Sequence, residues 1–136
     1  MELTEVLEEL RSLDEPTPRR PPLPTEADVA AAEAALGVRF HPDYRAFLLT
    51  ASDVTHGTLE PATLDPESHT YLVDVARSAW EEMELPRKLL PICEDNGDYF
   101  CMEPSGRVVY WSHNGTTDES WPDLATWIKQ VWIEGE

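Results

Sequence analysis

The sequence predicts a single α+β domain in which helices pack on an antiparallel β-meander. Apolar residues recur every three to four positions in the first half of the chain and again near its C-terminal end, which is the period of a helix with one buried face. Between residues 89 and 112 the period changes to two, as in the strands of an antiparallel sheet. The chain has 136 residues, 41% of them hydrophobic, which suits one domain with a substantial core.

The first 24 residues are expected to form a helix followed by a proline-rich segment. Five of the ten residues 15–24 are proline, which favours extended chain without regular structure. This segment is either a stiff connector or an arm packed on the domain that follows, residues 25–136; a proline-rich ligand for a peptide-binding module is a further alternative. Four residues follow the i, i+3, i+4, i+7 spacing that predicts the preceding helix over residues 2–13: Leu3, Val6, Leu7 and Leu10.

Two helices are predicted next. Thr25 and Asp28 resemble a capping box at the start of the first helix, and Gly37 is placed to end it in a left-handed conformation. Pro42 suits the first position of the second helix, which extends to residue 51. The apolar residues that define their buried faces are Val29, Ala32 and Leu36 in the first helix, and Tyr44, Phe47, Leu48 and Ala51 in the second.

The middle of the chain is predicted to hold a short strand and one more helix. Residues 57–64 are expected to form the strand, and Asp65-Pro66 to begin a helix that runs to about residue 84, before Pro86. A strand over residues 71–75 is the alternative. The helical period is carried by Leu72, Val73, Ala76, Trp80 and Met83.

Three antiparallel strands and a final helix complete the prediction. The strands are expected over residues 89–93, 99–103 and 107–112, joined by turns at 94–98 and 104–106. The residues from Ser120 to Asp123 are placed to cap the last helix, whose apolar face is Leu124, Trp127, Ile128 and Val131. The residues expected to be mostly buried are Leu36, Tyr44, Phe47, Leu48, Ile92, Phe100, Val109, Trp127 and Ile128.

Three runs of residues resemble the signatures of the SUKH superfamily, in matching order and spacing over roughly residues 22–133. The resemblance implies an α+β fold. It also implies a role in binding other proteins, because the superfamily includes the fungal Smi/Knr cell-wall-assembly regulators and many bacterial immunity proteins. The runs are Pro24-Thr25, Glu33, Leu36-Gly37-Val38, Pro42, Tyr44 and Phe47-Leu48; then Leu90-Pro91-Ile92-Cys93 and Asp95-Asn96-Gly97-Asp98-Tyr99-Phe100; and then Gly106, Val108 and Tyr110-Trp111-Ser112-His113.

Motifs for catalysis or cofactor binding are absent from the sequence. It contains no GxGxxG, P-loop or GxSxG pattern. Cys93, Cys101 and His113 do not have the spacing of a zinc site, so the cysteines are expected to be small buried residues, reduced and free of metal. A calcium loop at residues 92–103 would begin at Ile92, which has no oxygen in its side chain. We therefore expect no enzyme activity, no cofactor and no metal. A small hydrolase using Glu94, Asp95, Asp98 and His113 is the weaker alternative.

The formal net charge of −17 is the strongest compositional feature. Residues 60–136 alone carry sixteen acidic and five basic residues. Such a charge repels nucleic acid and anionic membranes, and it attracts basic proteins. The expected partner-binding residues are in polar loops of this half, Glu94, Asp95 and Asp98 in the first meander turn and Asp118 and Glu119 before the last helix. Solubility alone is the alternative reason for these acids, and an exposed Trp121 or Trp132 is the alternative centre of an interface.

Together these features predict an immunity protein that binds and neutralises a basic toxin domain, such as a nuclease. The resemblance implies this role, and the acidic charge supports it independently. A regulatory scaffold of the Smi/Knr type is the alternative, although this chain has almost none of the long flanks of the fungal proteins. The N-terminal residues lack the basic patch and apolar run of a secretory signal, no run of 18 apolar residues is present, and two cysteines are too few for a disulfide framework. We therefore expect a soluble cytoplasmic protein, of an oligomeric state that the sequence does not specify.

Overall fold

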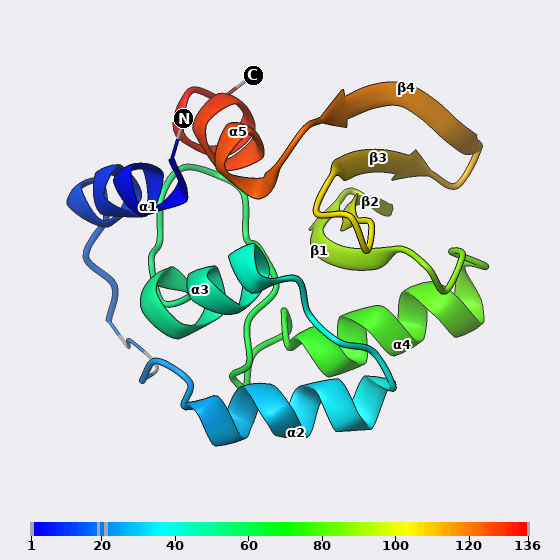
Figure 1. Ribbon diagram of the computed structural model, residues 1–136, viewed down its shortest axis with the longest axis horizontal. Helices are drawn as coiled ribbons and strands as arrows, with labels where there is room; N and C mark the ends of the chain where they lie inside the picture. Colours follow the sequence, from blue (N-terminus) through cyan, green and yellow to red (C-terminus); the bar gives the residue numbers. More distant parts are fainter. Residues whose placement is uncertain (1, 19, 21, 136) are drawn as a thin grey trace.

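The computed structural model describes residues 2–18, 20 and 22–135. Figure 1 shows α2 and α4 along one side of the molecule and α1 next to α5 on the other, with α3 between them and the sheet against α4 and α5. The elements, in chain order, are α1 (Leu3–Ser12), α2 (Glu26–Leu36), α3 (Pro42–Ala51), α4 (Leu72–Glu82), β1 (Leu90–Asp95), β2 (Asp98–Met102), β3 (Val108–Ser112), β4 (Gly115–Trp121), α5 (Leu124–Trp127) and the π-helix η1 (Ile128–Ile133).

The four strands form an antiparallel meander in the order β1-β2-β3-β4, which confirms the predicted fold class. In the first hairpin Leu90 pairs with Met102 at one end and Asp95 pairs with Asp98 at the other. Each of β1 and β4 is an edge of the sheet. Part of the β1 edge is covered, because Pro61 forms an isolated antiparallel bridge with Cys93.

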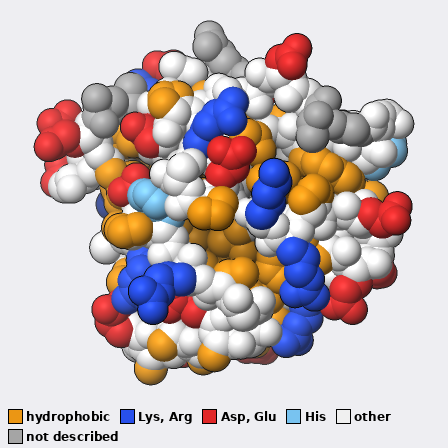
Figure 2. All heavy atoms as spheres, turned by 45° about the vertical axis from the view of Figure 1, so that its right-hand side comes forward, with side chains coloured by type: hydrophobic (Ala, Val, Ile, Leu, Met, Phe, Trp, Pro, Cys, Tyr) orange, Lys and Arg blue, Asp and Glu red, His pale blue; other side chains and the backbone are white. Residues whose placement is uncertain are grey.

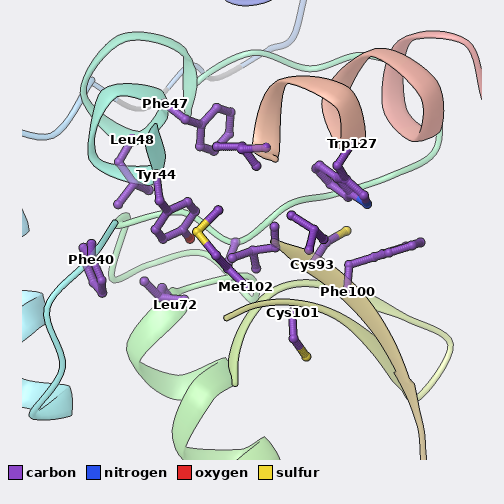
Figure 3. Close-up of a cluster of buried hydrophobic side chains, with 14 of the residues drawn as sticks. Phe40, Tyr44, Phe47, Leu48, Leu72, Cys93, Phe100, Cys101, Met102 and Trp127 are labelled. Atoms are coloured by element: carbon purple, nitrogen blue, oxygen red, sulfur yellow. The ribbon is translucent and has the colours of Figure 1, made fainter. Parts of the chain in front are cut away.

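The core lies on both faces of the sheet. Figure 3 shows Cys101 pointing toward α4, whereas Phe100 points to the opposite face, where its ring lies 5.3 Å from that of Trp127 in α5. This arrangement follows from the alternation of side chains along β2. Eight of the nine residues predicted to be mostly buried are buried, and Val109 is only half-buried.

The predicted helix boundaries in the first half are confirmed by the cap geometry. Thr25 Oγ1 accepts a hydrogen bond from the Asp28 backbone N–H at 3.2 Å, and the Thr25 N–H donates to the Asp28 carboxylate at 2.8 Å. Gly37 follows α2 with φ of 70°, a left-handed conformation that glycine adopts without steric cost. Pro42 is the first residue of α3, as predicted.

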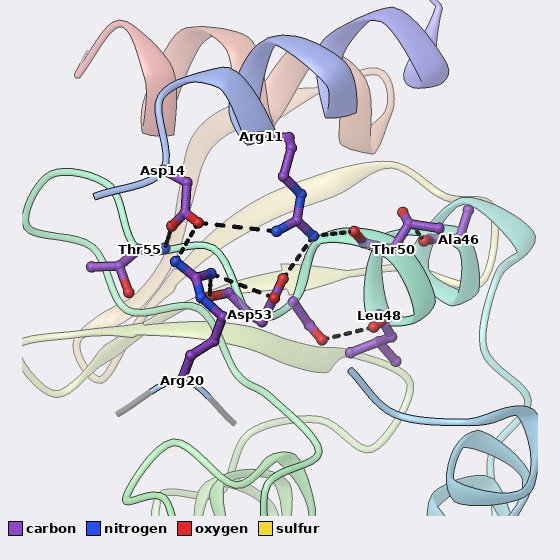
Figure 4. A network of polar contacts seen from close by, with 9 residues as sticks. Arg11, Asp14, Arg20, Ala46, Leu48, Thr50, Asp53 and Thr55 are labelled. Atoms are coloured by element: carbon purple, nitrogen blue, oxygen red, sulfur yellow. Dashed lines mark hydrogen bonds and ion pairs between the residues drawn. The ribbon is translucent and has the colours of Figure 1, made fainter. Parts of the chain in front are cut away.

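The N-terminal helix packs on the core through α3 and α5. Val6 and Leu10 of α1 are 3% and 0% exposed. Figure 4 shows the polar network beside them, in which the Arg11 guanidinium lies 2.7 Å from the Asp53 carboxylate and donates to the Thr50 carbonyl. Arg20, in the proline-rich segment, lies 2.6 Å from Asp14 and also contacts Asp53. Arg20 thus ties this segment to the residues that follow α1 and α3.

Two predictions for the middle of the chain are wrong. Residues 57–64 form only isolated bridges, Pro61 with Cys93 and Thr63 with Tyr71. Helix α4 begins at Leu72, not at Asp65-Pro66. The Asp65 carboxylate accepts a hydrogen bond from the Glu67 N–H at 3.1 Å, so it closes a local turn and the chain stays irregular until the Thr63–Tyr71 bridge. The long loop between α3 and α4 is held to the sheet by these bridges.

The residues before the last helix form strand β4, although the sequence predicted a loop there. The strand is an edge of the sheet and carries few apolar residues, so it lacks the alternation on which a sequence prediction depends. The helix that follows begins as predicted, with the Asp123 carboxylate accepting from the Thr126 N–H at 2.8 Å. Trp132 is 4% exposed and donates to the His56 carbonyl, so it is a core residue and not the exposed interface centre that was the alternative. Within the described part of the chain, no helix has the length and apolar character needed to cross a membrane.

Candidate protein-binding surface

The tight turn between β1 and β2 brings two predicted site residues together. Asn96 and Gly97 both have positive φ angles, 52° and 91°, as in the two-residue turns that match the twist of a hairpin. Asp95 and Asp98 face each other across this turn. The hydroxyl of Tyr110 lies 3.1 Å from an oxygen of each carboxylate. Because a phenol has one proton to donate, it bonds to one of the two acids at a time.

Asp98 also joins the two turns at this end of the sheet. Its Oδ1 accepts from the His113 backbone N–H at 3.2 Å and lies 2.9 Å from His113 Nδ1. The hydrogen bonds from the His113 side chain and backbone lower the pKa of Asp98 below its usual value. Burial raises the pKa of Tyr110, and its bonds to the two carboxylates raise it further. Asp98 thus acts inside the domain, where it holds the β1–β2 turn against the start of the β3–β4 turn.

Glu94 differs from Asp98, because its side chain is exposed and forms no hydrogen bond or ion pair with any described residue. Glu94, Asp95 and Asn96 line one side of a surface hollow of about 340 Å³. The other side is the loop between α3 and α4, which contributes Glu60 and His69. Their side chains contact each other, with His69 Nε2 lying 3.1 Å from the Glu60 carboxylate.

The α3–α4 loop also lines a second hollow, of about 380 Å³, and the two hollows share Glu60 and His69. The second hollow adds Asp53, which is paired with Arg11 and Arg20, and also Asp65 and Glu67. Of the described residues that line either hollow, none is Lys or Arg. We call this surface, comprising the two hollows and the Glu94–Asn96 rim, the acidic face. The sequence prediction missed Glu60 and His69, because nothing in the sequence indicates that their loop packs beside the β1–β2 turn.

The other two predicted site residues lie elsewhere on the sheet. Asp118 and Glu119 are exposed on β4, and their carboxylates contact no described residue. Since β2 and β3 separate β4 from β1, and neighbouring strands are about 4.8 Å apart, the two edges lie about 14 Å from each other. The structure therefore brings Glu94, Asp95 and Asp98 together at one end of the first hairpin and places Asp118 and Glu119 on the opposite edge.

Comparison with known proteins identifies the family. The family model SUKH_5, described as SMI1-KNR4 cell-wall, matches residues 3–133. The chain belongs to this SUKH family. A crystal structure of a protein from Pseudomonas syringae pv. tomato matches with a TM-score of 0.92 and 44% sequence identity, over 97% of this chain and 99% of that one. No curated protein matches the sequence significantly.

The cysteines of this SUKH domain lie in its core. Cys93 and Cys101 are both 0% exposed and free of a disulfide. Burial raises the pKa of the Cys93 thiol to about 12 and raises that of Cys101 as well, so neither is a thiolate near neutral pH. In the described residues, no group of three or more His, Cys, Asp or Glu side chains is placed to hold a metal ion. What the surface offers chemically is a set of exposed carboxylates, suited to contacts with Lys and Arg.

Proposed function

We propose that this SUKH-family protein is an immunity protein that binds a basic toxin domain, such as a nuclease, and neutralises it without enzymatic activity of its own. The observation that carries the proposal is the acidic face, where two adjoining hollows are lined by acids and by no described Lys or Arg. A toxin that holds phosphate needs a basic surface. An acidic protein that docks there blocks the substrate, and its charge accelerates the encounter.

The acids on this surface have different parts in the proposal. Glu60, Glu94 and Asp95 border one hollow and are placed to contact Lys and Arg of the toxin. Asp98 holds the turn that presents Glu94 and Asp95. Asp118 and Glu119 extend the surface along β4. A standard interface covers about 800 Å² of each partner and is therefore about 30 Å wide, so a single toxin domain can reach both edges of the sheet.

The test uses stopped-flow fluorescence to measure association with a basic toxin domain, sought among the products of the neighbouring genes. The variant Glu60→Gln/Glu94→Gln/Asp95→Asn is expected to lower the association rate constant by about tenfold or more, with a smaller change in dissociation. Raising the ionic strength from about 0.01 M to 0.15 M shortens the Debye length from about 30 Å to about 8 Å and should also slow wild-type association.

The matched control is Glu2→Gln/Glu5→Gln/Glu8→Gln, which makes the same change in net charge at exposed positions of the N-terminal segment. It is expected to slow association less than the acidic-face variant. If the two variants slow association equally, net charge alone explains the effect. That result would refute the acidic face as the docking surface. Failure of the protein to protect cells that express this toxin would refute the immunity function.

A regulatory scaffold of the Smi/Knr type is the second candidate, and it is favoured by the family description itself. The two candidates differ in what binding does to the partner. An immunity protein abolishes the activity of a toxin in a stoichiometric mixture, whereas a scaffold binds a partner and leaves its activity intact. A titration of toxin activity with the purified protein distinguishes them.

A further inference from the structure

Most of the described cations of this acidic protein have a partner, and Arg77, for example, donates to the Ala35 carbonyl. Arg11, Arg20, Arg45, Arg107 and Lys129 each form ion pairs with carboxylates. Arg39, Arg87 and Lys88, in contrast, are exposed and form no ion pair with any described residue. In a chain with 27 acidic and 10 basic residues, three cations without a counter-charge in one place are unexpected.

These three cations line the same groove, which has a volume of about 250 Å³. We call it the basic groove. Among the described residues that line it, Glu103 is the one acid, and its carboxylate lies 3.6 Å from the Arg107 guanidinium. Figure 2 looks onto a side of the molecule where Lys and Arg side chains surround an apolar hollow. The apolar lining consists of Val38, Phe40, Leu90, Met102 and Pro104.

The groove is held in shape by contacts to the core. The Arg87 guanidinium lies 4.9 Å from the centre of the buried Trp80 ring, a cation–π contact that keeps its position. The imidazole of His41 is oriented by its Nδ1, which accepts from the Asp43 N–H at 3.1 Å. Because these side chains are already positioned, a ligand loses little free energy in ordering them.

The basic groove lies at the opposite end of the first hairpin from the acidic face. Leu90 and Met102 form the pair at the groove, and Asp95 and Asp98 form the pair at the turn. The five residue steps from Leu90 to Asp95 span about 17 Å along the strand. This is about twice the Debye length at physiological ionic strength, so a ligand in the groove interacts with the local cations more than with the acidic face.

We propose that the basic groove binds an acidic segment of a partner protein, which places one apolar side chain on the groove floor between carboxylates that contact Arg39, Arg87 and Lys88. Two features favour a short acidic segment over other ligands. The volume is below the range of about 300–1,000 Å³ typical of small-molecule sites, and suits one side chain better than a cofactor. The overall negative charge disfavours a long polyanion such as nucleic acid, whereas a short segment needs only a few local contacts.

The experiment is a selection from a phage library of random octapeptides, with wild-type protein as the target and the variant Arg39→Gln/Lys88→Gln for counter-selection. Both positions are exposed, so this variant is expected to fold; Arg87 is left in place because it packs on Trp80. The selected peptides are expected to carry Asp or Glu on both sides of a Leu, Phe or Trp. Their synthetic forms should bind the variant at least about tenfold more weakly than wild-type.

The matched control is Arg77→Gln/Gln130→Glu, which makes the same change in net charge at exposed positions outside the groove. It is expected to bind the selected peptides like the wild type. Amide chemical-shift changes on binding should centre on residues 38–41, 87–90 and 102–104.

Three results would overturn the proposal. The first is a selection that yields no peptide preferring wild-type protein, or yields basic peptides. The second is equal loss of binding in the control and the groove variant. The third is a wild-type dimer in analytical ultracentrifugation that Arg39→Gln/Lys88→Gln dissociates, because the occupant would then be a second copy of this chain. None of these results bears on toxin binding by the acidic face.

Discussion

The imidazole of His41 lies against the backbone of Gly106, so closely that a β-carbon on Gly106 would stand 2.6 Å from its Nε2. Gly106 also has a φ of 95°, which other residues rarely adopt. This contact joins the start of α3 to the turn between β2 and β3, and it sets the position of one side chain of the basic groove. The turn therefore needs glycine for two separate reasons, backbone conformation and space.

The variant Gly106→Ala should lower the free energy of unfolding by more than backbone strain alone, which costs about 1–2 kcal/mol. Gly97→Ala is the matched control, since Gly97 has a similar φ of 91° but no atom within 4 Å of the added β-carbon. Urea unfolding of both variants measures the difference. Adding His41→Ala to Gly106→Ala should recover part of the loss, and a double variant that shows no recovery would contradict the proposed clash.

Leu10 should be essential to stability although it lies outside the predicted SUKH-like segment 25–136. Its side chain is fully buried in α1, so Leu10→Ala is expected to cost about 2–5 kcal/mol in the free energy of unfolding. Leu13→Ala, at 37% exposure, should cost less than about 1 kcal/mol. Chemical denaturation of the two variants compares them, and similar small losses would mean that α1 is not part of the core.

Tyr44→Phe should leave the protein as stable as the wild type, or stabilise it. Tyr44 is 1% exposed and its hydroxyl has no hydrogen-bond partner among the described residues. The small cavity beside it, which Trp127 also lines, has no room for a water molecule. Removing the hydroxyl therefore removes a buried polar group without breaking a bond. Phe47→Ala, in the same helix, leaves a cavity in the core and should instead lower the free energy of unfolding by about 3–5 kcal/mol. Thermal unfolding measures both variants.

The contribution of Asp98 to stability should depend on pH in the acid range. Because the pKa of Asp98 is lowered in the folded state, its contribution is present above the unfolded pKa of about 3.9 and is lost as the pH falls through the folded value. The stability difference between wild type and Asp98→Asn should therefore be largest above about pH 5 and shrink below about pH 3. Asp118→Asn removes a carboxylate that contacts no described residue and serves as the control. A difference for Asp98→Asn that stays constant with pH would contradict the assigned contacts.

Local sequence determined those parts of the structure that depend on near neighbours in the chain. The pair Thr25 and Asp28 sets the start of α2, and Gly37 sets its end, because caps involve residues within one turn of the helix. The apolar periods of α3 and of the first three strands likewise select which side chains face the core. The β1–β2 turn follows from Asn96-Gly97, so the grouping of Glu94, Asp95 and Asp98 could be predicted as well.

Only the tertiary structure decided what surrounds that turn. Strand β4 is a polar edge of the sheet. It forms through hydrogen bonds to β3, which no local sequence pattern predicts. Glu60 reaches the acidic face because its loop is bridged to β1, some thirty residues later in the chain. Arg39 and Lys88 meet at one groove because two separate helices end beside the same hairpin. Binding surfaces of this kind combine residues that are distant in the sequence. The local charge of such a surface therefore depends on how folding brings these residues together.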